Sequence, residues 1–547
     1  MTQRVGITGH ASPNRRRSAA AWAALLYALG ACTGTIGEPF TAAPEGKGGN
    51  VGASGDPRIA LRVWRLSPEQ LNSEVARMFG ASAPRLTIPE TAAEHGVTNV
   101  ASNAVVDLGN ASAFVDGARS IGVWVASQKN ASTRCSDYGS DACVDSFIRW
   151  LVPAAYRRPL TQNDETELRT LYGGLRAAYD YDYAIAGMVR AVLLSPEFLY
   201  RTELGAQAPA QLTPNEIANL LAFAITDRSP DAQLRQAAES GALLSPDERE
   251  KQARRLMLDS ERVWQRFFWE WLEMSTLYSQ GQEVGLDAAL VTQMEAEYKA
   301  FVRDVVITQR ASLRELLSAP YTWVQPELAV FYGATHPGTG VAKVQLDPRQ
   351  RGGLLTQGAW LVSHGKKGRD NVVRRGMNIF RQAMCNNDLR PPAGVDVQAE
   401  LKKLVGPDAS VRETVDARAA AASCGGCHRV ADPVGMVFES FASDGKWQAS
   451  YPDGKPVDTH IDITGIGDSD NPHAYATALP DDPHSQRRFV QRFAHFLVGV
   501  DLGSPEMVAW TAQARERFVA TSTSLEELLV SLVRHAAFIE RRTENGP

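Results

Sequence analysis

Apolar residues recur at intervals of three and four along most of the chain, which is the spacing of one helix face. One such stripe runs through residues 290–305 and comprises Leu290, Met294, Tyr298, Phe301, Val302 and Val305. An aromatic stripe at the same spacing comprises Trp264, Phe267, Phe268 and Trp271. At helical spacing such a stripe is more often core than the lining of a ligand cleft. Period-two runs between hairpin turns are scarce, so the pattern predicts a mainly α fold.

Helix-start signals support this prediction. Three segments combine a hydroxyl N-cap, proline at the first helical position and Glu or Gln at the third: Ser67-Pro68-Glu69-Gln70, Thr213-Pro214-Asn215-Glu216 and Ser245-Pro246-Asp247-Glu248. Ser524-Leu525-Glu526-Glu527 has the same box without proline. A hydroxyl and an acid at this spacing cap the first turn reciprocally, and proline is tolerated at the first helical position.

The N-terminus has the features of an export signal. Arg15, Arg16 and Arg17 precede a short apolar run that ends in Leu29-Gly30-Ala31-Cys32. A basic flank, an apolar core too short to span a bilayer and small residues at its end are typical of a secretory signal peptide. The ending resembles a bacterial lipobox, which implies a signal peptide at 1–31 and a diacylglycerol on Cys32. The alternative is an ordinary signal peptide that is cut nearby.

The segment that follows is rich in Gly, Ala and Pro, so residues 32–57 are expected to be a flexible tether. Thr33 stands where many inner-membrane lipoproteins carry Asp. We therefore expect an exported protein, periplasmic or in the outer membrane, held on the membrane by its lipid anchor. A net charge of −5 gives no electrostatic case for nucleic acid.

Cysteine usage fits export. Cys135 and Cys143 flank the loop "SDYGSDA" and are predicted to form a local disulfide in an oxidising compartment, with two buried thiols as the alternative. Cys385 has no predicted role.

The strongest functional signal is the sequence Cys424-Gly425-Gly426-Cys427-His428. In c-type haem attachment two thiols add to the vinyl groups of the porphyrin, and the adjacent histidine binds the iron. The spacing places Cys424 and Cys427 on neighbouring turns of a helix, with His428 as the proximal iron ligand. Zinc would need two further ligands, and the next histidine is His460. A redox dithiol would need a βαβ setting. The motif occurs once, which predicts one covalent haem c.

Residues on either side of the motif raise three further questions. Asp432-Pro433-x-Gly435 is turn chemistry and predicts the end of the attachment helix. The aromatic residues that follow are expected either against the haem or in the general core: Phe438, Phe441 and Trp447. A basic segment at 365–376 suits haem propionates or a solvated loop, and it contains Lys366, Lys367, Arg369, Arg374 and Arg375.

The distal iron ligand is left open by the sequence. Met507, 79 residues after His428, is the first candidate, because small cytochromes often use a downstream methionine. The rivals are His364, His473, His495, Met377, Met384 and Met436. A lone Met or His is usually structural. A five-coordinate iron is a further alternative, and such an open site can bind peroxide or oxygen.

The segment "CGGCHRVADPVGMVFESFASDGKWQ" resembles the haem-binding part of a family of large secreted bacterial cytochrome-like proteins built from strings of uncharacterised domains. Further similarity to this family lies in "WRLSPEQLNSEVARMFG" (64–80), "AAYRRPLTQNDETELRTLY" (154–172) and "LTPNEIANLLAFAITDRSPDAQL" (212–234). The chain departs from the family at Met436, where Phe is usual, and at Ala442-Ser443, where a pair containing Asp is usual. The resemblance implies architecture far more than activity.

The resemblance and the composition together predict a multidomain helical protein with a cytochrome c-like haem segment in its C-terminal third. The predicted units are an N-terminal helical unit at 58–132, a second helical unit with the disulfide at 133–205, a large helical unit at 206–335, a haem unit at 345–450 and a C-terminal helical unit at 455–547.

Three functions fit these residues. The first is a lipid-anchored electron-transfer protein with a redox partner protein. The second is an exported haem oxidoreductase, with an open iron and a substrate pocket formed by the helical domains. The third is a binding or scaffold protein with a non-catalytic haem. Signatures of nucleotide binding, serine hydrolases and zinc proteases are absent from the sequence, which gives no catalytic residues.

Overall fold

Helices make up nearly all the regular structure of the computed structural model, which confirms the predicted mainly α fold. The structure describes residues 58–89, 98, 110–206, 211–367, 371–384, 399, 403–406, 408–422, 424–463, 467–500 and 505–542. The predicted signal peptide and tether, with Cys32, lie outside the described residues, as do Arg369 and Cys385.

One group of helices packs around a core drawn from residues 66–199 and Phe223. Its helices are α1 (Pro68–Phe79), α2 (Ala111–Ser127), α3 (Asn130–Thr133), α4 (Asp141–Tyr156), α5 (Gln162–Ala178), α6 (Tyr181–Leu194) and α7 (Pro196–Leu199). Gly122 of α2 lets the backbones of α2 and α6 approach, since a Cβ there would lie 2.5 Å from the Ala186 carbonyl oxygen. The predicted units at 58–132 and 133–205 thus share one core.

A second continuous core covers the rest of the described chain, from Leu212 to Ile539 together with Ile59. Its first half contains α8 (Pro214–Thr226), α9 (Ala232–Glu239), η2 (Ala242–Leu244), α10 (Pro246–Leu256), η3 (Met257–Asp259), α11 (Glu261–Trp271), η4 (Met274–Thr276), α12 (Leu277–Val284), α13 (Ala288–Val302), η5 (Arg303–Thr308), α14 (Leu313–Ser318) and α15 (Pro326–Phe331). Its second half contains η6 (Leu354–Thr356), α16 (Gly358–Ser363), α17 (Val372–Ile379), η7 (Phe380–Met384), α19 (Val411–Ala420), α20 (Gly425–Met436), α21 (Pro472–Ala478), η8 (Leu479–Asp481), α22 (Pro483–Val498), α23 (Pro505–Ala520), α24 (Leu525–Arg534) and η9 (Ala536–Phe538).

The described strands form four two-stranded ladders. β2 (Arg62–Arg65) pairs antiparallel with β3 (Tyr200–Glu203), β4 (Tyr321–Val324) with β5 (Ala342–Gln345), and β6 (Ile461–Ile463) with β7 (Gly467–Ser469). β1 (Ile59–Ala60) runs parallel to β8 (Arg541–Arg542), so the two ends of the described chain lie side by side.

The aromatic stripe of α11 lies in the second core, as predicted. Trp264, Phe267 and Phe268 are almost fully buried. The Trp264 ring stacks on Phe493 of α22 with their centroids 4.6 Å apart, and Phe267 meets the same ring edge-on. Burying three large aromatic side chains stabilises the contact by several kcal/mol (roughly 2 kcal/mol each). This contact ties the C-terminal helices to the middle of the chain.

The predicted capping boxes form at two of four positions. Ser67 and Thr213 exchange both bonds with the residue three positions on. At Ser245 and Ser524 the hydroxyl still caps the helix, but the acid three residues on does not return the bond. Glu527 instead pairs with Arg254 of α10 and Arg517 of α23, where both partners of each hydrogen bond are charged.

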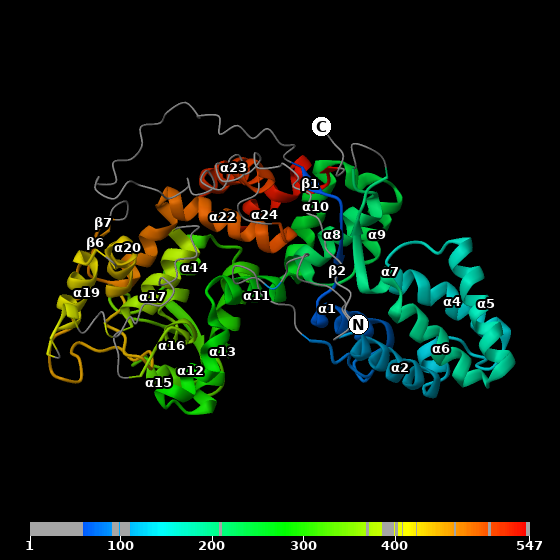
Figure 1. Cartoon of the computed structure of the whole chain (residues 1–547), viewed down its shortest axis with the longest axis horizontal. Coiled ribbons are helices and arrows are strands. Elements are labelled where there is room, and N and C mark those ends of the chain that lie inside the picture. The colour runs from blue at the N-terminus through cyan, green and yellow to red at the C-terminus, as the bar shows by residue number, and fades with distance from the viewer. Residues whose placement is uncertain are drawn as a thin grey trace, which may run out of the picture.

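The molecule is elongated and arched (Figure 1). The helices α1–α7 form one end, and α17, α19 and α20 form the other, with α22–α24 running between them. The cysteine motif on α20 therefore lies far from the N-terminal helices. Across the described ranges, no helix combines the length and the apolar character that a membrane crossing requires.

Candidate haem-attachment site

The cysteine motif begins α20 directly after a tight connection from α19. The Gly425 N–H donates to the Ala421 carbonyl at 2.7 Å, and the Cys424 N–H donates to the same oxygen at 3.2 Å. A Cβ at Gly425 would overlap the Ala419 carbonyl oxygen, so this close approach requires glycine. The connection thus fixes where the first turn of α20 starts.

Cys424, Cys427 and His428 are brought together on that first turn. Cys424 is the N-cap of α20, and the spacing i, i+3, i+4 places the three side chains on one side of the helix. Both cysteines are half-buried thiols. Burial, with the nearby Cys424 sulfur, raises the pKa of the Cys427 thiol. The predicted attachment residues are therefore present in the chemical form that attachment needs.

The His428 ring is held by a buried carboxylate. Its Nδ1–H donates to Oδ1 of Asp432, one turn further along α20, at 2.8 Å. Arg418 of α19 donates from Nε to the other oxygen, Oδ2, at 2.9 Å. The Asp432 side chain is 0% exposed and that of Arg418 is 7% exposed. This pairing fixes the tautomer, so Nε2 is the ring nitrogen that can bind iron.

The donors of the motif are not gathered as in a tetrahedral zinc site. In the described residues the ligand atoms of Cys424, Cys427 and His428 do not all come within 4.8 Å of one another, whereas a tetrahedral zinc site would gather them. His460 is exposed, and its carbonyl accepts from Arg412 at 2.5 Å. Two thiols and an imidazole are the donor set that covalent haem attachment uses.

The attachment helix continues through the turn that the sequence predicts. α20 ends at Met436, with Pro433 in its interior, so the prediction that Asp432-Pro433-x-Gly435 ends the helix is wrong. An interior proline removes one helical hydrogen bond and costs about 3 kcal/mol. A close crossing with α17 offsets this cost: Cβ atoms at Gly376 and Gly435 would overlap the carbonyl oxygens of Ala431 and Val372.

The three aromatic residues after the helix belong to the core. Phe438 is fully buried and lies edge-on to Trp360 and Tyr475, with ring centroids 5.0 Å and 6.0 Å apart. Phe441 packs against Trp447 at 5.3 Å. The structure thus shows their core packing, and their contact with a haem stays a prediction.

The basic segment contains one arginine with a different role from either prediction. Arg375 is 0% exposed and donates to the carbonyls of Phe438, Phe441 and Ala442 at 2.6–2.9 Å. It therefore clamps the loop after α20 and is neither a propionate ligand nor a solvated side chain. Arg374 is exposed and donates to Gln280.

The candidate distal methionines are buried or half-buried, and they lie on different helices. Met507 is fully buried in α23, which packs against α22 and α24, whereas α20 packs mainly against α17 and α19. Met436 is fully buried at the end of α20. Met384 accepts from the Tyr475 hydroxyl at 3.8 Å. Met377 lies half-buried on α17. Met507 stays a prediction as an iron ligand.

The rival histidines are engaged with backbone carbonyls. Nε2 of His364 lies 2.9 Å from the Leu272 oxygen, and Nε2 of His473 lies 2.6 Å from the Ser318 oxygen. Burial lowers the pKa of His364 to about 4. Nδ1 of His495 lies 2.5 Å from the Val500 oxygen. Each ring thus makes a hydrogen bond with a backbone carbonyl, and as iron ligands these histidines stay predictions.

Three parts of the chain match models of protein families. Residues 143–203 match PSD5, a protein of unknown function (DUF1595), and residues 212–334 match PSD4, a protein of unknown function (DUF1592). Residues 351–451, which include the cysteine motif, match PSCyt3, a protein of unknown function (DUF1588). The chain carries three domains of the PSD and PSCyt series. The search of curated proteins gave no match, and the search of solved structures gave none.

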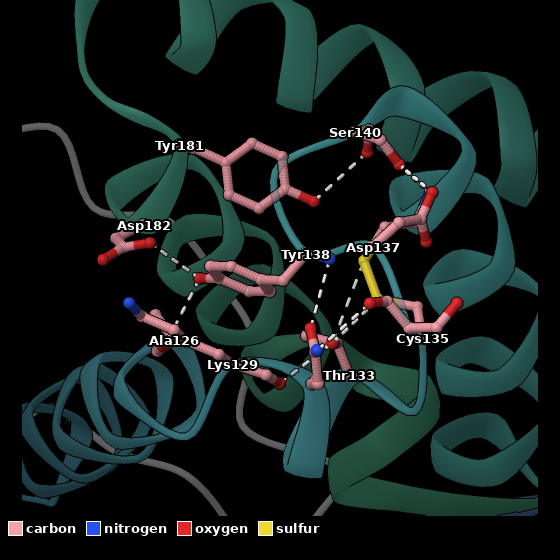
Figure 2. Close-up of a disulfide and its surroundings, with 12 residues drawn as sticks. Ala126, Lys129, Thr133, Cys135, Asp137, Tyr138, Ser140, Tyr181 and Asp182 are labelled. Carbon is pink, nitrogen blue, oxygen red and sulfur yellow. Dashed lines mark hydrogen bonds between the residues drawn. A yellow bond between two sulfur atoms is a disulfide. The ribbon is translucent and has the colours of Figure 1, made fainter.

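The PSD5 domain begins at a disulfide. The structure joins Cys135 and Cys143, and Figure 2 shows the tyrosines around the bond. The Tyr138 hydroxyl donates to Asp182 of α6 at 2.8 Å, and burial together with this bond raises the pKa of Tyr138. The Tyr181 hydroxyl donates to a carbonyl of the bridged loop at 3.3 Å. The loop is thus fixed to α6 as well as closed on itself.

The sequence did not predict the residues that hold His428 and α20 in place within the PSCyt3 domain. Asp432 has a local signal, since it stands four residues after His428 and i, i+4 residues share a helix face. Arg418 stands 14 residues before Asp432, and only the α19–α20 hairpin brings them together. The glycines Gly376 and Gly435 have no signal in one sequence that separates a helix crossing from a turn.

Proposed function

We propose that this chain is an exported, lipid-anchored c-type haem protein that acts in electron transfer. The observation that carries the proposal is the first turn of α20, where two thiols and an imidazole with a fixed tautomer lie on one face. The domain name PSCyt3 hints at a cytochrome and supports it. Cys32 would carry the lipid, which would hold the protein at the periplasmic side of a membrane.

In attachment, the Cys424 and Cys427 thiols would each add across one vinyl group of a haem. A sulfur–carbon bond would form and the thiol hydrogen would pass to the other vinyl carbon, so nothing would leave and no oxidant would be consumed. His428 would hold the iron through Nε2, and Asp432 would keep the proton on Nδ1. When bound, haem c supplies an iron that takes one electron from a donor protein and passes it to an acceptor protein of higher potential.

The proposal is tested on the full chain, expressed in a host that exports it and attaches haem. We expect a pyridine haemochrome spectrum with both vinyl groups saturated, and a mass increase of one haem per chain. Cys424→Ala/Cys427→Ala should lose the covalent haem. Cys135→Ser/Cys143→Ser is the matched control, because it removes two other cysteines and should keep the haem. A wild-type chain without haem would overturn the proposal.

Two further measurements separate the parts of the proposal. Cys32→Ala should release the haem protein from membranes, which tests the anchor alone. A reduced spectrum of a six-coordinate, low-spin iron, unchanged by carbon monoxide, is expected for electron transfer. A five-coordinate spectrum that responds to carbon monoxide would contradict electron transfer and favour a haem oxidoreductase.

A further inference from the structure

Asp432 joins two helices and the predicted iron ligand in one buried hydrogen-bond chain. Arg418 on α19 donates to Oδ2, and His428 on α20 donates to Oδ1, at 2.9 Å and 2.8 Å. The His428 side chain is 21% exposed, while Asp432 has no exposed surface. The hydrogen-bond chain therefore runs from an imidazole with a small exposed fraction to an arginine in the interior.

Burial makes this carboxylate a strong acceptor. Water does not screen its charge, and a charge-assisted hydrogen bond in a low-dielectric interior is shorter and stronger than one between neutral groups. A metal-bound imidazole that donates to a carboxylate is a more basic ligand than one that donates to a neutral acceptor. The bond to Asp432 is thus placed where it can change the electron density on Nε2.

We propose that Asp432 is a positioning residue that increases electron donation from His428 to the haem iron and so lowers the reduction potential. This inference rests on the proposed haem attachment. A more electron-rich iron favours the oxidised state. Arg418 limits the effect, because it holds the second carboxylate oxygen and draws negative charge away from the one that faces His428.

The alternative is that Asp432 only ties α19 to α20. A purely structural ion pair would need Arg418 and Asp432 but not the contact with His428. Another arginine of α19 provides the comparison: Arg412 donates to Asp458 at 2.8 Å, and this carboxylate is 53% exposed. Asp458→Asn is therefore a matched control, since it removes a carboxylate from an α19 arginine away from His428.

The test compares Asp432→Asn with Asp458→Asn in the haem-attached full chain. Two readouts are used: the reduction potential by spectroelectrochemical titration, and the tetragonal ligand-field splitting of the oxidised low-spin iron, obtained from its electron paramagnetic resonance g values. Asp432→Asn should raise the potential and lower the ligand-field splitting. Asp458→Asn should leave both at wild-type values. The splitting matters most, because it reports donation through the imidazole and not charge acting at a distance.

Arg418→Gln provides a second variant in case Asp432→Asn does not fold. Removing the arginine leaves more of the carboxylate charge on the oxygen that faces His428, so the ligand-field splitting should rise and the potential should fall. Attached haem with a wild-type ligand-field splitting in either folded variant would overturn the role of Asp432. Absence of haem in the wild-type chain would instead overturn the proposed function itself.

Discussion

Gly435 of α20 faces Val372 of α17 so closely that a Cβ on the glycine would overlap the Val372 carbonyl oxygen. The obstacle is backbone, so no change of rotamer can relieve it. We therefore expect Gly435→Ala to lower the free energy of unfolding by about 1–3 kcal/mol, the usual cost of overpacking. Thermal unfolding followed by circular dichroism measures the effect.

Gly426 provides the control for this change on the same helix. It is exposed, and a Cβ there would meet nothing within 4 Å. Gly426→Ala should be neutral or stabilise the helix by up to about 1 kcal/mol, because alanine is the better helix former. Equal destabilisation by both variants would show that the crossing with α17 is not the cause.

Glu203 joins the two ends of the described chain through two arginines, of which Arg541 is buried and Arg62 is partly exposed. It accepts from Arg541 of β8 at 2.5 Å and 2.9 Å, and from Arg62 of β2 at 2.8 Å and 3.1 Å. Burial alone would raise the pKa of Glu203, but Arg541, Arg62 and Arg201 lower it to about 2. Glu203→Gln leaves the buried Arg541 and the partly exposed Arg62 without their counter-charge, and should cost about 3–5 kcal/mol at pH 7.

The pH dependence gives a second measure of this cluster. Since the folded pKa lies below the ordinary 4.5, the stabilisation is present above pH 4.5 and is lost as the pH falls toward 2. In denaturant titrations, the free energy of unfolding of Glu203→Gln should therefore fall less than that of wild type as the pH is lowered from 4.5 to 2. Glu69→Gln removes an exposed glutamate that pairs with two arginines, and should cost less than about 1 kcal/mol.

The disulfide closes a short loop at the edge of the N-terminal core. Cys135 and Cys143 are eight positions apart, and a loop of this length contributes about 2–3 kcal/mol by the chain-entropy model. Cys135→Ser/Cys143→Ser should therefore unfold at lower denaturant concentration. A reductant should shift the wild-type midpoint by the same amount and leave the variant unchanged. A reductant effect on the variant would assign the shift to another part of the chain.

The site shows what one sequence can and cannot predict. The helix through the cysteine motif follows from local spacing, and so does the grouping of Cys424, Cys427 and His428. The end of α20 does not, because Pro433 and Gly435 have turn chemistry and only the neighbouring α17 makes a helix the better solution. Arg375 is a second exception. Its place in a basic segment predicts an exposed side chain, but it is buried because the carbonyls of the loop after α20 accept hydrogen bonds from it. Local signals predict elements, and long-range contacts decide these exceptions.

Glu297, in the PSD4 domain, should make the protein less stable as the pH rises, which is the opposite of the effect expected for Glu203. It is buried, and its two oxygens accept from the hydroxyls of Thr322 at 2.8 Å and Tyr332 at 2.6 Å. Burial raises the pKa of Glu297 to about 7, although these two bonds act against the rise. The folded protein thus keeps a proton that the unfolded chain releases near pH 4.5. Stability from this group is present below pH 4.5 and is lost as the pH rises toward 7.

A pKa shift of this size lowers the free energy of unfolding by about 3 kcal/mol between pH 4.5 and pH 8. Glu297→Gln cannot ionise, so its free energy of unfolding should lack this decline, and the difference from wild type should change with pH by that amount. Glu327→Gln, at an exposed position of α15, should follow the wild-type curve. Urea titrations at half-unit pH steps measure all three proteins. A Glu297→Gln variant whose stability runs parallel to wild type across this range would show that the buried carboxyl does not titrate there.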